Sequence, residues 1–194
     1  MISTIPELNG LVLSGGKSTR MGRDKGALIY HGVTQRKHLY QMLLPYCKEV
    51  YISCKSEQRE HPDELPVIED AVEGAGPATG ILSAFMKKPH SAWLVLACDV
   101  PFLTPATLTC LVEGRNPEKV ATAFFNPATG FPEPLITIWE PAGYLLLSEF
   151  RRKGYNCPRK VLINSDIQIL HAPDAKELQN VNLASEYEEV IKLF

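Results

Sequence analysis

The stretch GLVLSGGKSTRMGRDKG, residues 10–26, joins an apolar run to a loop rich in glycine and basic side chains. The run at 10–14 predicts a buried strand, because a short apolar segment bounded by glycines is typical of parallel sheets. The letters GGKST do not form a P-loop, since that motif needs its first glycine at position 11, where this chain has leucine. Gly15 and Gly16 are adjacent and the next glycine is Gly22, so the Gly-x-Gly-x-x-Gly dinucleotide fingerprint does not fit either.

Short apolar runs alternate with stretches of helical period along the rest of the chain, which indicates a parallel sheet covered by helices. We therefore predict a single-domain α/β fold over residues 1–194, a Rossmann-like three-layer sandwich with a mostly parallel central sheet and helices on both faces. The most apolar run, AWLVLACD at 92–99, should be the central strand. Other strands are expected at 49–54, 66–70, 119–125, 134–139 and 166–170, and helices within 34–47, 74–88, 104–114, 142–154 and 185–194.

Composition sets broad limits on function. The chain has 194 residues, 45% hydrophobic and 22% charged, with a net charge of -2, which are ordinary globular values and favour neither a nucleic-acid nor a membrane surface. Its five cysteines form an odd set without a Cys-x-x-Cys pair, so we expect reduced thiols and no zinc knuckle. The first residues lack the pattern of a signal peptide, and the expected location is cytoplasmic.

Polar groups gather where the predicted strands end, and ligands of open parallel sheets bind at those carboxyl ends. The first strand ends in Ser14, and Asp70 and Asp99 end two later strands, so we expect these carboxylates on neighbouring strand tips. Four cations follow the first strand: Lys17, Arg20, Arg23 and Lys25. Glycine backbone and nearby cations suit a triphosphate, whereas the alternative interpretation is a mobile basic turn.

Asp99 is a candidate ligand for Mg²⁺, a hard cation that takes few protein ligands. The alternative role, capping the next helix, is better filled by Thr104, which precedes a proline at the first helical position. Asp70 is open to a second interpretation, because an acid before a glycine-rich loop is also ordinary turn chemistry.

These residues belong to motifs that follow one another along the chain. They are Leu13-Ser14-Gly15-Gly16, Arg20-Met21-Gly22, Asp24-Lys25-Gly26, Ile68-Glu69-Asp70, Gly76-Pro77 with Gly80, Cys98-Asp99-Val100-Pro101 and Asn180-Val181-Asn182. In this order they resemble the nucleotidyltransferases of molybdenum cofactor maturation, most closely the molybdenum cofactor guanylyltransferase, or MobA, family. The resemblance spans the chain and implies a nucleotide-diphospho-sugar transferase-like fold.

The resemblance implies an Mg²⁺-dependent enzyme that transfers GMP from GTP to the phosphate of molybdopterin, releasing pyrophosphate and forming the guanine dinucleotide cofactor. It implies that Lys25, Asp99 and Arg20 are catalytic, that Asp99 holds the metal, and that Asn180 and Asn182 lie on the pterin side. The implied nucleotide-binding residues are Leu13, Ser14, Gly15, Gly16, Lys25, Ser53, Asp70 and Asp99. The implied partners are GTP, molybdopterin or molybdenum cofactor, and the molybdoenzymes or cofactor-insertion proteins that receive the product.

Several alternatives stay open on sequence alone. Ser53 stands where the family tends to have asparagine, so a cytidylyltransferase that uses CTP is the first alternative; a non-catalytic nucleotide- or cofactor-binding protein and a sugar-phosphate nucleotidyltransferase are the others. Asn180-Val181-Asn182 also fits a polar turn that caps the last helix, since Ser185 and the acids after it are a normal helix start. Residues 125–134 are expected to be a Pro/Gly-rich loop.

Overall fold

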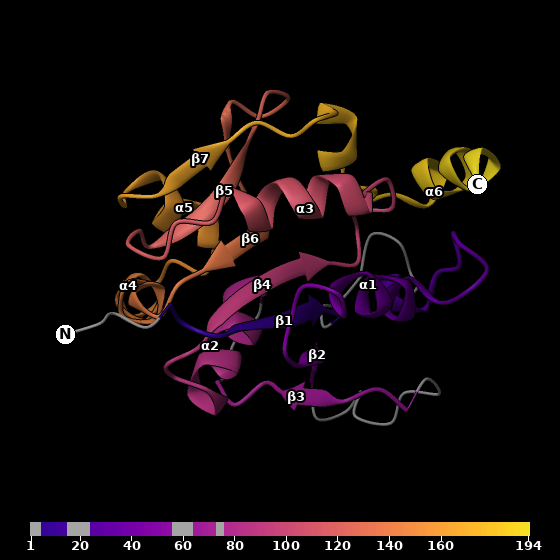
Figure 1. Cartoon of the computed structure of the whole chain (residues 1–194). Coiled ribbons are helices and arrows are strands. Elements are labelled where there is room, and N and C mark those ends of the chain that lie inside the picture. Colours follow the sequence, from indigo (N-terminus) through magenta and orange to yellow (C-terminus); the bar gives the residue numbers. More distant parts are fainter. Residues whose placement is uncertain (1–4, 15–23, 56–63, 73–75) are drawn as a thin grey trace.

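The computed structural model describes residues 5–14, 24–55, 64–72 and 76–194, which form a seven-stranded sheet with helices on both faces (Figure 1). In the order β3-β2-β1-β4-β6-β5-β7, β6 alone runs antiparallel to its neighbours, so the predicted mostly parallel α/β sheet is confirmed. The strands are β1 (Leu8–Leu13), β2 (Val50–Cys54), β3 (Val67–Glu69), β4 (Ala92–Ala97), β5 (Ala121–Asn126), β6 (Phe131–Trp139) and β7 (Gln168–Leu170).

The central position of β4 explains its apolar sequence. It pairs with β1 on one side and with β6 on the other, and all its residues are buried. Alternate side chains point to opposite faces of a strand, so Leu94 packs into the core on one face while Trp93 and Val95 pack on the other. Both faces of the sheet are therefore covered, as the continuous apolar run predicts.

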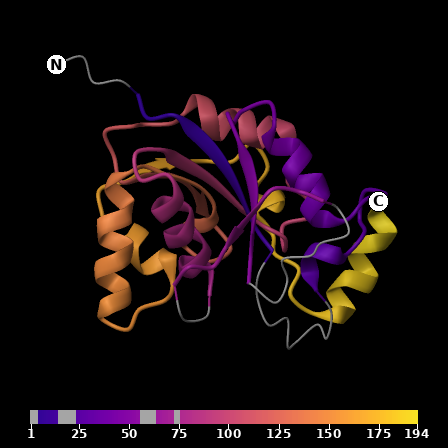
Figure 2. The ribbon, with the colours of Figure 1, turned by 90° about the horizontal axis from the view of Figure 1, so that it is seen from below.

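Each face of the sheet has its own set of helices (Figure 2). On one face, α1 (Gln35–Leu43) and α3 (Pro105–Glu113) bury Leu39 and Leu108 against the strands. On the other face, α2 (Pro77–Lys87), α4 (Ala142–Arg152) and α5 (Pro158–Ile163) bury side chains such as Phe85 and Leu147. Each such fully buried side chain stabilises the fold by about 1.5–3 kcal/mol.

The prediction of a loop over residues 125–134 is wrong for most of that range. β5 runs to Asn126 and β6 begins at Phe131, so the connection is a short hairpin turn. The prolines fit because Ile136 is the first residue of β6 that pairs with β4; Pro132 and Pro134 lie beyond β4, where their missing N–H groups break no hydrogen bond to that strand. The start of β6 thus extends past β4 at the carboxyl end of the sheet.

The end of the chain packs beside α1 (Figure 1). The helix expected within 185–194 is α6 (Ala184–Val190) followed by a short 3-10 turn, η4 (Ile191–Leu193). Phe194 contacts Tyr30, His31 and Phe102, which joins this end to the segments that precede α1 and follow β4. Within the described residues, no helix has both the length and the apolar character needed to cross a bilayer.

Candidate active site

The carboxyl ends of β1 and β4 lie side by side, because Leu13 pairs in register with Ala97. Ser14 and Asp99 follow directly from these ends, and the backbone N–H of Ser14 donates to Ser53 O at 3.1 Å, which ties β1 to β2 on its other side. Strand pairing therefore brings residues from three separate stretches to one edge of the sheet.

Lys25, Asp99 and Asn182 meet at this edge. Lys25 Nζ donates to Asn182 Oδ1 at 2.6 Å and lies 3.5 Å from Asp99 Oδ2. The backbone N–H of Val181 donates to Asp99 O at 2.7 Å, which places the 180–182 turn against the end of β4. The side chains of Lys25 and Asp99 are 21% and 14% exposed, so the pair is partly shielded from water yet accessible to a ligand.

The electrostatics of Asp99 suit a cation ligand. Burial raises the pKa of its carboxyl, and the nearby Lys25 ammonium partly offsets that effect. Its Oδ1 atom is buried and has no hydrogen-bond partner among the described residues. A buried carboxylate oxygen without a partner is costly, so this oxygen is where an additional positive or hydrogen-donating group would be most strongly bound.

A short 3-10 turn, η1 (Lys25–Ala27), presents Lys25 to Asp99. Asp24 caps this turn by accepting the Gly26 N–H at 2.9 Å, and its other oxygen lies 3.1 Å from the Arg36 guanidinium. Gly26 packs so closely on Ser14 that a Cβ there would lie 2.2 Å from Ser14 Oγ. Only glycine fits this contact, and the turn is therefore seated directly on the end of β1.

Asp70 and Asp99 do not end neighbouring strands, which corrects the sequence-based expectation. Asp70 follows β3, and both β2 and β1 lie between β3 and β4. Asp70 Oδ1 accepts a hydrogen bond from Ser53 Oγ at 3.2 Å, and burial raises the pKa of its carboxyl. The two carboxylates thus stand on opposite sides of the β1 end.

Ser53 is closely packed as well as hydrogen-bonded. A Cβ on Gly80 would lie 2.3 Å from Ser53 Oγ, so a glycine at this point of α2 is required by the contact. The side chain of Ser53 is buried, and its hydroxyl joins the end of β2 to Asp70. The serine that departs from the family pattern therefore has a defined partner in this chain.

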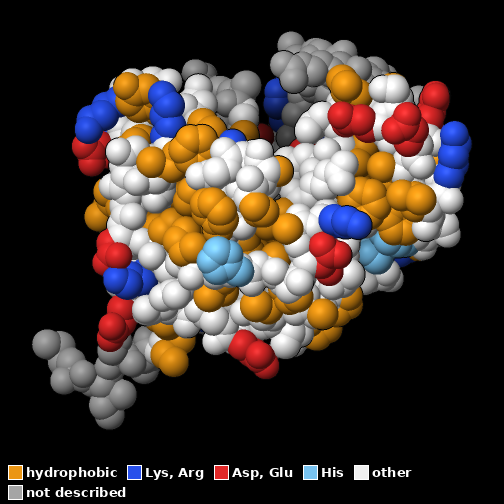
Figure 3. Space-filling view, turned by 90° about the horizontal axis from the view of Figure 1, so that it is seen from above, with side chains coloured by type: hydrophobic (Ala, Val, Ile, Leu, Met, Phe, Trp, Pro, Cys, Tyr) orange, Lys and Arg blue, Asp and Glu red, His pale blue; other side chains and the backbone are white. Residues whose placement is uncertain are grey.

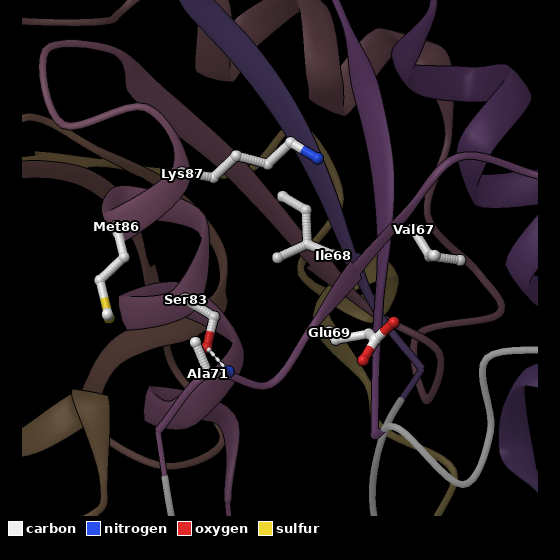
Figure 4. Close-up of a pocket in the computed structure, with 7 residues that line it drawn as sticks. All are labelled: Val67, Ile68, Glu69, Ala71, Ser83, Met86 and Lys87. Carbon is white, nitrogen blue, oxygen red and sulfur yellow. Dashed lines mark hydrogen bonds between the residues drawn. The ribbon is translucent and has the colours of Figure 1, made fainter.

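A hollow of about 470 Å³ lies between β3 and α2, and its lining includes Glu69 and Ala71, the sequence neighbours of Asp70 (Figure 4). Its wall includes Ser83, whose Oγ accepts the Ala71 N–H at 2.9 Å and donates to Thr79 O. This contact holds the turn after β3, and with it Asp70. None of the sequence-predicted site residues lines the hollow itself.

The 180–182 turn is tied to the start of α6. Glu186 Oε2, in the first turn of α6, accepts the backbone N–H groups of Asn182 and Leu183, at 2.6 and 3.0 Å, so the cap contact is made by Glu186 and not by an asparagine side chain. The side chain of Asn182 remains available and binds Lys25. Asn180 Oδ1 is buried without a partner among the described residues. One segment therefore ends in a helix cap and also contributes to the site.

Beside this turn lies a cavity of about 490 Å³, walled by the β5–β6 hairpin and by the segment that leads to α6. Its lining includes Asn126, Glu133, Arg159, Asn180 and Asn182. Glu133 is fully buried and accepts from Asn126 Nδ2 at 3.1 Å, while the Arg159 guanidinium is 3.9 Å away. Burial raises the pKa of Glu133, and the charge of Asp99 adds to this effect. From the sequence Glu133 has no predicted catalytic role, because Glu133-Pro134-Leu135 resembles only a stretch that precedes a strand in the family.

Three residues of the predicted site, Gly15, Gly16 and Arg20, lie outside the described residues. The structure brings together Ser14, Lys25, Asp99 and Asn182 around the ends of β1 and β4. It places Ser53 and Asp70 on the β2–β3 side of that edge and Asn180 on the cavity side.

A mostly parallel sheet with a lysine, carboxylates and close-packed glycines at its strand ends defines the class of nucleotide-binding α/β proteins. Within that class, residues 10–166 match the model of the MobA-like NTP transferase domain, and the chain belongs to this family of nucleotidyltransferases.

The face in Figure 3 carries acidic and basic side chains interspersed rather than one large patch of a single sign.

Named relatives agree with the family. The chain is 33% identical over 185 residues to a molybdenum cofactor biosynthesis bifunctional protein of Synechocystis, covering 94% of this chain but 53%, about half, of that longer protein. It is 30% identical to a molybdenum cofactor guanylyltransferase of Pseudomonas paraeruginosa, covering 93% of this chain and 92% of the relative. A crystal structure of molybdopterin-guanine dinucleotide biosynthesis protein A from Archaeoglobus fulgidus shares the fold, with a TM-score of 0.79 at 20% identity over 95% of this chain and 97% of that one.

Proposed function

We propose that this chain transfers GMP from GTP to the terminal phosphate of molybdopterin or molybdenum cofactor, forming the guanine dinucleotide cofactor and pyrophosphate. The observation that carries the proposal is the contact of Lys25 with both Asp99 and Asn182, where the strand ends meet the cavity. The donor nucleotide and the acceptor must meet for the reaction to occur. In this proposal they meet at Lys25, between the strand ends that bind the nucleotide and the cavity that binds the acceptor. The names of the full-length relatives support the same chemistry.

The donor side of the site is the β1–β3 edge. In this proposal Leu13 and Ser14 meet the base through their backbone, Asp70 meets the nucleoside with Ser53 behind it, and Lys25 binds the phosphates. Gly15, Gly16 and Arg20 complete the phosphate site; they lie outside the described residues and enter here from the family pattern. The hydrogen bond from Ser53 to Asp70, at 3.2 Å, gives this edge a defined polar group for the nucleoside in this proposal.

The residues present fit one Mg²⁺. This ion keeps several waters and binds through one or two carboxylates and substrate phosphates, and Asp99 supplies one carboxylate whose Oδ1 lacks a partner among the described groups. No cluster of three or more His, Cys, Asp or Glu that could hold a metal occurs in the described residues, so a site built by protein ligands alone is not seen there. When bound, Mg²⁺ would neutralise charge on the triphosphate.

The transfer needs positioning and charge more than covalent help. An oxygen of the acceptor phosphate forms a bond to the α-phosphorus of GTP, and the bond from that phosphorus to the bridging oxygen of the β-phosphate breaks, which releases pyrophosphate. The attacking phosphate is already ionised, so no general base is required. Lys25 has three N–H donors, of which Asn182 takes one; its charge stabilises negative charge on the phosphates as the bonds change.

The acceptor side is the cavity beside Asn180 and Asn182. Its volume of about 490 Å³ is in the range of small-molecule sites, and Asn180 Oδ1 offers a buried acceptor without a partner among the described residues. In this proposal the pterin lies there, and molybdoenzymes or cofactor-insertion proteins receive the product. All five cysteines are free thiols, which fits the cytoplasmic location that we propose.

The test uses the purified protein with Mg²⁺, molybdenum cofactor and either α-labelled GTP or α-labelled CTP. We expect label from GTP in the pterin product, and none when Mg²⁺ is removed by a chelator. Label from CTP in the pterin product would instead show that the protein is a cytidylyltransferase. Label from neither nucleotide, with the cofactor intact, would refute transfer and leave a binding protein.

A further inference from the structure

Arg36 is a buried cation on α1 that the proposed reaction does not use. Its side chain is 3% exposed, and its Nη1 lies 3.1 Å from Asp24 Oδ2 and 3.5 Å from Ser14 Oγ. Burying a guanidinium is unfavourable unless it is paired and hydrogen-bonded. Such pairs contribute little to the free energy of unfolding compared with apolar side chains of similar size. Holding a particular segment in place is therefore the better explanation for this pair.

The pair holds the turn that carries Lys25. Asp24 uses one carboxylate oxygen for Arg36 and the other for the Gly26 N–H, at 2.9 Å, which closes the 3-10 turn. Arg36 therefore fixes the capping group of the turn, and Lys25 is the residue immediately after that group. Without the guanidinium, Asp24 could rotate away from Gly26 and leave the first turn uncapped.

The same guanidinium also acts on the end of β4. Burial raises the pKa of the Cys98 thiol to about 12; the charges of Asp99 and Asp24 add to this, whereas the charge of Arg36 and a hydrogen bond with Ser14 oppose it. Cys98 directly precedes Asp99. Arg36 thus contacts the end of β1 and the turn that carries Lys25, and its charge also acts on the end of β4.

We propose that Arg36 is a positioning residue for nucleotidyl transfer, which acts through Asp24 to hold Lys25 beside Asp99. This inference rests on the proposed function for its catalytic readout. The proposal includes no contact between Arg36 and substrate. It predicts that replacing Arg36 has little further effect in a variant that already lacks the Asp24 carboxylate. Small displacements of a catalytic group can lower rates by roughly 10²-fold.

The experiment compares R36M, R36K, D24N and the double variant D24N/R36M with the wild type. For each we would measure kcat and KM for GTP, KM for the acceptor, the affinity for GTP in the presence of Mg²⁺ by calorimetry, and the thermal unfolding midpoint. We expect R36M to lower kcat/KM for GTP by roughly 10²-fold with the acceptor KM unchanged. R36K should retain part of the activity, because lysine keeps the charge but not the planar guanidinium.

The decisive arm is the double variant. If Arg36 acts through Asp24, R36M should add little to the loss already caused by D24N, since coupled residues are not additive. Additive losses, or a lower unfolding midpoint with unchanged kcat and KM for GTP, would overturn the inference and leave Arg36 as a structural residue. If R36M does not fold, R36K and D24N carry the test.

A matched control is R115M, which removes another arginine from its carboxylate, the buried Glu140, at the end of the sheet opposite to Lys25. We expect it to lower the unfolding midpoint and to leave KM for GTP unchanged. If the wild type binds GTP but does not transfer it, the proposed function fails while the GTP affinities of the same variants still decide the role of Arg36. A wild type that neither binds nor transfers GTP would refute both.

Discussion

Two arginine–carboxylate pairs lie at opposite ends of the sheet, and they differ in what they hold. Arg115 binds both oxygens of Glu140, at 2.7 and 2.9 Å, and also donates to Pro6 O at 2.8 Å, so its Nε and Nη2 groups are bonded within the protein. Arg36 lies 3.1 Å from Asp24 and 3.5 Å from Ser14. The first pair ties the start of β1 to the end of β6, and the second supports the turn that carries Lys25, the proposed phosphate ligand.

The comparison teaches that a buried charge is not by itself a sign of function. Glu140 and Glu133 are both fully buried, yet Glu140 is bidentately paired at the amino end of the sheet, while Glu133 lines a cavity at the carboxyl end. A functional pair is distinguished from a structural one by the group that it positions and by whether a ligand can reach that group.

The largest effect is expected from R115M on stability. Removing one partner of a buried pair leaves the carboxylate of Glu140 without compensation, which should cost about 3–5 kcal/mol of unfolding free energy. Urea denaturation followed by circular dichroism would measure it. Transfer per folded molecule should be unchanged at a temperature where the variant is folded. A variant as stable as the wild type would show that the Arg115 pair is not the structural clamp described here.

D99N should produce the reverse pattern. It removes the proposed metal ligand with almost no change in volume, so we expect turnover to fall by roughly 10²–10³-fold while the unfolding free energy stays the same or rises. Steady-state rates over a Mg²⁺ titration, together with a denaturation curve, would test this. Retained turnover would remove Asp99 from the metal role.

K25A should weaken both GTP binding and turnover, with a rate loss of about 10²-fold. The loss follows from the missing cation at the phosphates and from the broken bond to Asn182. K160A is the matched control, because Lys160 is an exposed cation whose Nζ lies 3.9 Å from the Tyr155 ring centroid, outside the site residues described above. Equal kinetics for K25A and the wild type would show that the phosphate assignment is wrong.

The smallest effect concerns pH and α1, the helix that carries Arg36. His38 stacks on His31 at 3.8 Å, and burial, with the charge of His31, lowers its pKa to about 4. In the unfolded chain this histidine has a pKa of about 6.5, so below that pH the unfolded chain binds a proton that the folded chain does not. The contribution of neutral His38 to the free energy of unfolding is therefore fully present above pH 6.5 and is lost as the pH falls towards 4. We expect a decrease on the order of 1–2 kcal/mol, discounted for partial exposure.

Urea denaturation of wild type and H38Q at pH 7 and pH 4.5 would measure this difference. The wild type should lose more stability than H38Q between the two values. Identical pH dependence in wild type and H38Q would mean that His38 is not the titrating group.

Much of this structure follows from the sequence, because local patterns report local structure. The apolar run at 92–99 contains the central strand, and Thr104 caps α3. Strand order does not follow, since it depends on contacts between distant segments. For that reason Asp70 and Asp99 were expected on adjacent strands, although two strands separate them.

The residues that sequence reasoning missed are those whose roles depend on burial. Arg36 lies in a stretch with several polar residues, TQRKHLY, where nothing marks it as buried. Glu133 sits between two prolines in a segment that reads as a loop, because proline is more often a turn residue than a strand residue. Only the tertiary fold places one behind Lys25 and the other in the wall of the cavity.

The Lys25–Asn182 bond joins a residue inside the family match, which ends at 166, to one beyond it. In the proposed function, the donor side of the site therefore lies within the part of the chain that matches the family, and the segment after it supplies Asn182. On that assignment, a substitution at Asn182 changes the acceptor side without replacing any donor residue.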